Sequence, residues 1–241
     1  MYLRDLSRYR YDRFNFKVVT PPSAEQITLS EAREHLRVIA YGSPPLSDED
    51  AWIESNISVA REWCEGQSMC ALCVQMLELG IGAFPGAPWS AWNFVSPGGY
   101  LPYPYCSGYG IMLPMASPFI SIESVKYDDG SGVEQTLDPS AYYVNDYARP
   151  SVLYPAPGTF WPIAQFQNMR AVRVRYTCGY QLTGQSPTVS QDLPFEFRAA
   201  MLLVLGHLHE NRENSLDVEL HEIPLGAAAL MERYSVRLGI A

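Results

Sequence analysis

The densest group of chemically active side chains in this sequence is "MLLVLGHLHENRENS", residues 201–215, in which two histidines and two glutamates follow an apolar run. Histidine and glutamate are common metal ligands and proton carriers, so this stretch raises the question of a metal or catalytic site. A zinc-binding histidine pair on a helix needs i, i+4 spacing, as in H-E-x-x-H, which puts both rings on one face. His207 and His209 are two residues apart, or about 200° around a helix. The spacing therefore predicts the polar end of a structural helix, and nothing requires His221 to fold back as a further ligand.

Three further motifs match a ligand site only in part. Cys70 and Cys73 form a single C-x-x-C without the second pair that a zinc ribbon requires. The segment "GIGAFPG" (80–86) has a proline where a dinucleotide-binding loop needs its third glycine. The segment "YDDGSG" (127–132) lacks the spacing and the distal glutamate of a calcium loop, and the sequence contains no G-x-S-x-G nucleophile motif. We therefore predict a protein that is not an enzyme, with no catalytic residues, no metal and no cofactor.

The first 17 residues interleave basic and aromatic side chains and carry a net charge of +3. Guanidinium groups pair with phosphates while aromatic rings stack on bases, so this arm has the chemistry of a nucleic-acid contact. The same composition suits docking onto an acidic neighbouring subunit. Both alternatives stay open for its basic residues, Arg4, Arg8, Arg10, Arg13 and Lys17.

Residues 83–110 form a long segment rich in glycine, proline and aromatic residues, which we interpret as a packed loop. Its exposed aromatic rings could bind a carbohydrate, but such rings also bury area at protein interfaces. We favour an interface or self-packing role for its aromatic residues, Trp89, Trp92, Tyr100, Tyr103, Tyr105 and Tyr109.

The composition is that of a globular protein with a substantial core. Of 241 residues, 47% are hydrophobic and 18% are charged, which excludes a disordered chain. The net charge of −9 argues against general affinity for DNA or anionic membranes. No apolar run approaches the roughly 18 residues of a membrane span, and polar residues follow Met1 where a signal peptide would be apolar. With an odd number of cysteines, five, we expect reduced thiols in a cytosol.

Hydrophobic periodicity predicts helices at both ends of the chain and short strands between them. Thr28 and Glu31 have the spacing of a capping box, and a second helix is expected from Ser47 to a stop at Gly66. Strands are expected at 70–80, 111–114, 121–129, 133–137, 141–146, 151–154 and 170–180. Two more helices are expected at 195–213 and 224–238, and residues 199–205 of the first are apolar nearly all round, which suits enclosure on several sides.

The expected fold class is α+β: a small helical bundle of two N-terminal and two C-terminal helices, with a β-rich insertion between its halves. The parts would be a basic N-terminal arm (1–26), an N-terminal helical half (27–67), the β-rich insertion (68–182) and a C-terminal helical half (190–241).

The order of these elements resembles the head–tail connector, or head-completion adaptor, proteins of tailed bacteriophages. The segments that carry the resemblance are 27–38, 47–66, 84–86, 113–137, 160–162, 172–180, 193–213 and 222–234. Gly179-Tyr180 before the long helix and Asn211-Arg212-Glu213 at its end are part of the pattern. The arm 1–26 and the enlarged loop 87–110 depart from it, so no role is carried over to them.

The resemblance implies a structural virion protein that forms a ring, commonly of twelve copies, beneath the portal in the virion neck after assembly in the host cytoplasm. Such a ring extends the DNA channel without sequence-specific binding and offers a docking surface to the next neck or tail protein. No membrane is involved. The alternatives are another neck or tail-completion protein, or a carbohydrate-binding virion module that uses the aromatic loop.

Two sets of contact residues follow from the resemblance as hypotheses. The long helix would pack within and between subunits, with charge pairs setting their register. Its interface residues would be Glu196, Arg198, Leu202, Leu205, Glu210 and Arg212. The C-terminal segment would reach toward the portal through Tyr234, Arg237, Leu238 and Ile240.

Overall fold

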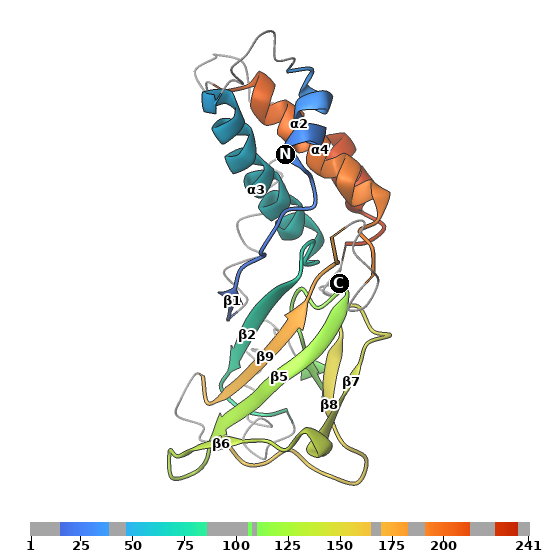
Figure 1. The fold of residues 1–241 in the computed structure, drawn as a ribbon. Coiled ribbons are helices and arrows are strands. Elements are labelled where there is room, and N and C mark those ends of the chain that lie inside the picture. Colours follow the sequence, from blue (N-terminus) through green and yellow to red (C-terminus); the bar gives the residue numbers. More distant parts are fainter. Residues whose placement is uncertain are drawn as a thin grey trace, which may run out of the picture. The chain divides into compact units, whose positions relative to one another are not determined.

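The computed structural model describes residues 15–38, 47–85, 106–107, 110–164, 170–182, 191–212 and 225–235 (Figure 1). Its helices are α2 (Leu29–Leu36), α3 (Ser47–Ser68), α4 (Phe195–Glu210) and α5 (Leu225–Met231), with a 3₁₀ turn η1 (Pro139–Ala141). Its strands are β1 (Phe16–Thr20), β2 (Gln75–Ile81), β3 (Cys106–Ser107), β4 (Gly110–Met112), β5 (Phe119–Asp128), β6 (Glu134–Thr136), β7 (Tyr142–Asn145), β8 (Val152–Pro155) and β9 (Val172–Cys178). The expected α+β class, with helices flanking a β-rich region, is confirmed.

The chain divides into two compact units. Residues Pro22–Cys73 and Tyr180–Ser235 form the helical unit, and residues Met1–Pro21, Val74–Gly179 and Val236–Ala241 form the β unit. The helical unit has 6 Lys and Arg against 17 Asp and Glu, a net charge of −11, whereas the β unit has 11 against 9, a net charge of +2. The acidity of this protein is therefore concentrated in its helices.

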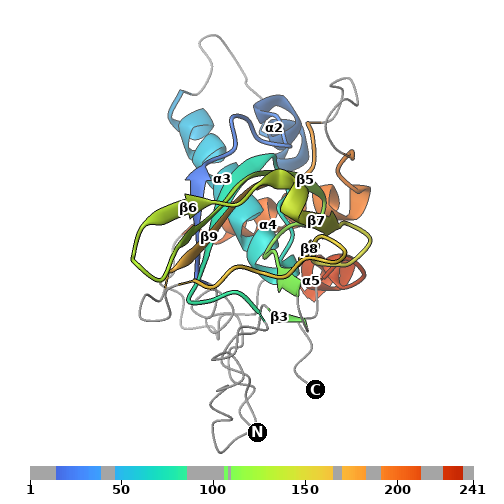
Figure 2. The same ribbon diagram turned by 90° about the horizontal axis from the view of Figure 1, so that it is seen from below.

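The helical unit is organised around α4. This helix contacts α2, α3 and α5, and α3 also contacts α2 and α5 (Figures 1 and 2). The expected capping box is present at the start of α2: the Thr28 hydroxyl accepts from the Glu31 N–H at 3.2 Å, and the Glu31 carboxylate accepts from the Thr28 N–H. The predicted long helix is also present, with Pro194 preceding its first turn.

The β unit contains two antiparallel sheets, one with the order β1-β2-β9-β5-β6 and one with the order β3-β4-β8-β7. Alternation along β9 and the first part of β2 buries Leu77, Leu79, Val174 and Tyr176 and turns the residues between them to the other face, while the end of β2 is buried throughout. The Tyr176 hydroxyl donates to the carbonyl of Pro114, just after β4, at 2.6 Å. This buried hydrogen bond ties the segment after β4 to the central strand of the larger sheet.

Several elements differ from the sequence expectations, including α4, which ends at Glu210 rather than at 213, and β3, which lies within the segment interpreted as a loop. Helix α3 runs past Gly66 to Ser68 and ends where Met69 adopts φ 56°, so a methionine takes the left-handed position expected of a glycine. The strand expected at 70–80 begins only at Gln75, because residues 71–74 bend after the helix. Helix α5 ends at Met231, seven residues earlier than expected. The expected arm contains an unexpected edge strand, β1, paired with β2.

Candidate assembly surface

Helix α4 packs against α2, α3 and α5 and leaves one strip of its surface exposed. Its buried residues, Phe197, Ala200, Met201, Val204 and Leu205, face the rest of the helical unit. On the opposite side, Phe195 is 85% exposed and Leu203 is 39% exposed, and Ala199 between them is also exposed. Some of the apolar residues at 199–205 therefore belong to the core, and the others form part of an exposed apolar stripe.

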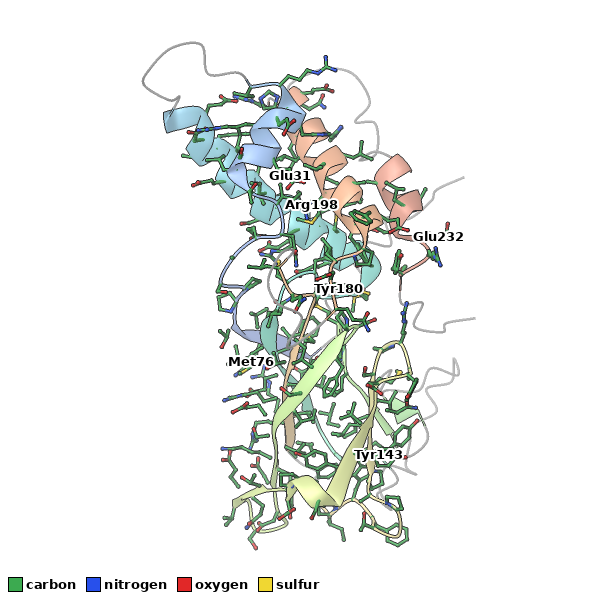
Figure 3. The ribbon with its side chains drawn as sticks, turned by 45° about the vertical axis from the view of Figure 1, so that its right-hand side comes forward. Glu31, Met76, Tyr143, Tyr180, Arg198 and Glu232 are labelled. Carbon is green, nitrogen blue, oxygen red and sulfur yellow. The ribbon has the colours of Figure 1, made fainter. Side chains whose placement is uncertain are left out.

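The charged residues of α4 bind acidic partners in their own chain. Arg198 donates to both carboxylate oxygens of Glu31, each at 2.6 Å, which joins α4 to α2 (Figure 3). The hydrogen bond from Arg198 holds the pKa of Glu31 below its usual value, although partial burial opposes that shift. Bidentate pairs of this kind fix geometry as well as charge. The side chain that the sequence suggested for subunit register therefore holds two helices of one copy together.

Arg212 and His209 meet a second acidic partner at the other end of the helix. Both side chains bind the Glu49 carboxylate of α3, His209 with Nε2 at 3.1 Å. The Arg212 guanidinium also lies 4.4 Å from the centre of the Trp52 ring, and His209 meets that ring edge to face. The hydrogen bond from Arg212 is the main reason that the pKa of Glu49 is lowered.

The two histidines of the segment 201–215 have different partners, as expected for side chains about 200° apart around a helix. His207 Nδ1 accepts from the Asn211 side-chain amide at 3.3 Å, four residues along the chain, whereas His209 binds Glu49. His221 lies outside the described residues. Within the described part of the chain, no group of three or more His, Cys, Asp and Glu residues could hold a metal ion.

The other predicted contact residues lie in varied surroundings. Glu210 is exposed, Glu196 and Leu202 are half-buried, and Leu205 is fully buried in the core of its own unit. Tyr234 is half-buried beside Phe197, with ring centroids 5.2 Å apart. The remaining candidates lie outside the described residues: Arg237, Leu238 and Ile240 at one end, Arg4, Arg8, Arg10 and Arg13 at the other, and most of the loop 83–110.

A buried polar cluster that the sequence analysis missed lies at the base of the helical unit. Arg61, whose side chain is 7% exposed, donates to Glu65 at 2.8 Å and to Glu25 at 2.9 Å. Glu65 also accepts from the Leu72 N–H at 2.8 Å, and its burial raises its pKa to about 7 in spite of Arg61. The i, i+4 spacing of Arg61 and Glu65 was the only signal in the sequence.

Gln26 extends this cluster with a single buried amide. Its Nε2 donates to the carbonyls of Leu72, Tyr180 and Gln181, at 2.8, 3.3 and 3.0 Å. Three chain segments far apart in the sequence are therefore joined at one side chain, next to the boundaries at which the helical unit begins and ends.

The cysteines of the C-x-x-C motif belong to the same region and lie in the core. Cys70 and Cys73 are buried and unbonded to each other, and so are Cys64 and Cys178. Burial raises the pKa values of Cys64 and Cys73 to about 12, so both remain thiols at neutral pH. The Cys70 thiol donates to the carbonyl of Tyr234 at 3.5 Å. These residues fill space and make weak hydrogen bonds.

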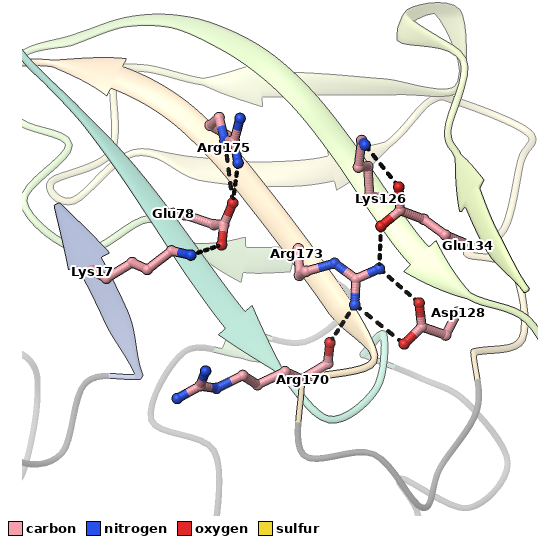
Figure 4. A network of polar contacts seen from close by, with 8 residues as sticks. All are labelled: Lys17, Glu78, Lys126, Asp128, Glu134, Arg170, Arg173 and Arg175. Atoms are coloured by element: carbon pink, nitrogen blue, oxygen red, sulfur yellow. Dashed lines mark hydrogen bonds and ion pairs between the residues drawn. The ribbon is translucent and has the colours of Figure 1, made fainter. Parts of the chain in front are cut away.

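The outer face of the five-stranded sheet carries an ionic network (Figure 4). Glu78 binds Lys17 at 2.8 Å and Arg175 at 2.6 Å, which links β1, β2 and β9. Arg173 binds Asp128 at 2.6 Å and Glu134 at 2.8 Å, and Glu134 also binds Lys126. Lys17, considered above as a possible DNA or neighbour contact, is 64% exposed but already has a carboxylate partner.

No protein-family model matches the sequence, and a search of curated proteins finds no significant match. Solved structures do contain similar chains. The neck of an empty gene transfer agent particle computed with C6 symmetry has one with a TM-score of 0.66. The virion of a native gene transfer agent particle gives 0.63, and the neck of a native particle computed with C12 symmetry gives 0.60. Each alignment has 22% identity and covers 92% of this chain and 96% of the other.

At this level of identity the likeness establishes the fold. This protein shares the fold of chains from gene transfer agent particles over nearly its whole length. Within the described residues, no helix is long and apolar enough to cross a membrane.

Proposed function

We propose that this protein is a structural component of a virion neck, in which copies form a ring beneath the portal, extend the DNA channel and present a docking surface to the next neck or tail protein. The observation that carries the proposal is the structural likeness, which covers 92% of this chain and 96% of the similar chain in a gene transfer agent neck. A likeness confined to the helices or to one sheet would support only a shared module.

The symmetry of the similar structures supports a ring. Two of them are necks computed with C6 and with C12 symmetry. A ring of twelve copies satisfies both symmetries, because a twelve-fold arrangement contains a six-fold one. Assembly around an axis also needs no catalytic group, which agrees with the structural role that we infer for the described side chains.

The charge distribution suits a channel for DNA. A net charge of −11 on the helical unit repels phosphates, so DNA could pass such a surface without sequence-specific binding. The genomic DNA would then be a passing partner, and the stable partners would be other copies, the portal and the following neck or tail protein.

Among the predicted interface residues, Glu196, Leu202 and Glu210 remain in the proposal as direct contacts. Arg198 and Arg212 would act indirectly, by holding α4 against α2 and α3 through Glu31 and Glu49. The segment from Tyr234 to the end of the chain is proposed to meet the portal.

Imaging of assembled particles that carry a labelled copy of this protein tests the main proposal. We expect label in a ring between portal and tail, and particles that lack the protein should fail to join head and tail. Label on fibres or on the capsid exterior would exclude the connector role.

A truncation tests the portal assignment separately. Removing residues 236–241 deletes three of the four proposed portal contacts, and the melting temperature of the truncated chain is the control for its folding. We expect loss of portal binding in a pull-down with purified portal rings. Full-strength binding by the truncated chain would refute this assignment and leave the ring proposal intact.

A further inference from the structure

The exposed face of α4 is an apolar stripe that spans three helical turns. Phe195, Ala199 and Leu203 recur every four residues on this face, and Phe195 is 85% exposed. Leu202 and Gly206 border the stripe and are half-buried, and Glu210 ends it. Isolated exposed apolar residues are ordinary, but a large aromatic ring that continues into a contiguous stripe is typical of a contact surface.

A different surface lies on the exposed face of α3. Ala51, Ser55 and Val59 recur there every four residues, and Val59 is 48% exposed. The buried face of the same helix, opposite them, consists of Ile53, Ile57, Ala60 and Cys64. Small side chains followed by an exposed valine make a shallow surface onto which a ring such as that of Phe195 can pack closely.

The two stripes face away from each other. Helices α3 and α4 are in contact, and each stripe lies opposite the buried face of its own helix. One copy therefore offers two unlike surfaces on different sides of the same unit. Such surfaces fit a heterologous contact, in which a patch on one subunit binds a different patch on the next and rotation about an axis closes a ring.

We propose that the α4 stripe, centred on Phe195 and Leu203, packs against the α3 stripe, centred on Ser55 and Val59, of a second copy of this chain. This inference rests on the proposed function, because ring assembly supplies the second copy. Its support is the pair of unlike stripes together with the C6 and C12 symmetries of the similar neck structures.

The size of the stripe explains how such a contact would behave. A stable pairwise interface buries roughly 800 Å² on each partner, which is more than three turns of one helix provide. The contact is therefore weak between two free copies and becomes stable when a ring closes, since each copy then makes it twice. The chain is expected to be monomeric at low concentration and to assemble on a template such as the portal.

Charge opposes this contact. The flanking residues Glu54 and Glu62 on α3 and Glu196 and Glu210 on α4 are all acidic, and the helical unit carries −11. Salt screens repulsion between like charges, so assembly should strengthen as ionic strength rises. A contact driven by the basic arm would weaken instead, which separates the two possibilities.

Substitutions on the two stripes test the inference in the full chain. Phe195→Glu and Val59→Glu are exposed changes, so the melting temperature should stay close to that of the wild type. Phe160→Glu is the matched control, because Phe160 is 86% exposed but belongs to the β unit. We expect each stripe variant to enter particle necks at least tenfold less than the wild type, and Phe160→Glu to enter normally.

Mixing makes the test specific for unlike surfaces. A Phe195→Glu copy keeps its α3 stripe, so a minority of it should block ring closure by the wild type. Two single variants, Ala199→Cys and Ser55→Cys, each with Cys106→Ser, should form an inter-chain disulfide only when mixed, because Cys64, Cys70, Cys73 and Cys178 are buried.

The outcomes separate this inference from the function on which it rests. Normal neck incorporation of Phe195→Glu, or cross-linking of Ala199→Cys with itself as fast as with Ser55→Cys, would overturn the inference while the protein remained a neck component. Absence of the wild-type protein from necks would overturn the proposed function as well.

Discussion

Arg61 of the helical unit and Arg173 of the β unit each donate hydrogen bonds to two carboxylates, but in opposite surroundings. Arg61 is 7% exposed between Glu25 and Glu65, whereas Arg173 is 23% exposed between Asp128 and Glu134 on the outer face of the larger sheet. The hydrogen-bond distances are similar. The difference between the two sites lies in how much water the ions have lost.

The pKa values of the carboxylates at the two sites shift in opposite directions. Burial raises the pKa of Glu65 to about 7, because the loss of water outweighs the attraction of Arg61. Around Arg173, the hydrogen bond from Lys126 lowers the pKa of Glu134, because that carboxylate has kept its solvent. The buried network therefore holds the helical unit together at a cost in desolvation, and the sheet network mainly makes a polar surface. The predictions below test this contrast, from the largest expected effect to the smallest.

Replacing Arg61 by methionine should have the largest effect. It leaves Glu65 buried without its cation, and breaking a buried pair in this way costs about 3–5 kcal/mol of unfolding free energy. Urea denaturation at pH 7.5 measures the loss. Glu62→Gln on the same helix is the control, because that side chain is 69% exposed and its pair with Arg61 is the longer one, at 3.6 Å. A loss for Arg61→Met no larger than that of the control would remove the distinction between the two networks.

The pH dependence of stability should identify Glu65. Its folded pKa of about 7 lies above its ordinary value of 4.5, so the folded state holds the proton more tightly. The resulting stabilisation is complete below about pH 4.5 and disappears as pH rises through 7, a change of up to about 3 kcal/mol. Other carboxylates with lowered pKa values act in the opposite direction. The measurement is therefore the difference in unfolding free energy between the wild type and Glu65→Gln, which should move in favour of the variant between pH 4.5 and 8. A difference that stays constant with pH would contradict the assignment.

Replacing Arg198 by methionine should have an intermediate effect. It removes two short charge-assisted hydrogen bonds to a half-buried Glu31, which corresponds to roughly 1–2 kcal/mol. Thermal unfolding followed by circular dichroism measures this loss. Glu31→Gln should lose less, because the amide still accepts one hydrogen bond. If Arg198→Met instead left stability unchanged and impaired only assembly, the original idea of Arg198 as a register residue would be restored.

Replacing Glu134 by glutamine should have the smallest effect. Its partner Lys126 is 42% exposed and Glu134 itself is 50% exposed, so solvent and salt screen both ends of the pair. The melting temperature should not change measurably, and neck assembly should be unaffected. A clear loss of stability would show that the sheet network carries more of the fold than its exposure indicates.

The helix boundaries and the strand pattern were largely accessible from the sequence because their causes are local. Thr28 and Glu31 marked the start of α2 through a capping box that needs only three residues of spacing. The alternation Val172, Val174, Tyr176 marked β9 and its buried face. Where a local signal was ambiguous, the boundary differed: Gly66 suggested a helix end, but α3 continues to Ser68.

The candidate surface was accessible only in outline. The apolar run in α4 indicated that the helix needs neighbours, but periodicity alone did not separate the residues that its own chain covers from those left outside. Leu205 and Phe195 are both apolar, yet one is fully buried and the other 85% exposed. The sequence also suggested charged residues for subunit contacts, whereas Arg198 pairs within its own chain with Glu31, 167 residues away.

By itself, then, the sequence determined the α+β class, the capped helix α2 and the long helix after Pro194. It also showed that His207 and His209 lack the spacing of a helical metal site. Each of these results depends on residues within a few positions of one another. Only the tertiary structure decided that Gln26 joins three distant segments, that Glu65 is buried enough to hold a proton near neutral pH, and that Phe195 is left outside. The burial of a residue and its contacts with distant residues depend on which surfaces pack together. The spacing of residues along the chain does not determine which surfaces those are.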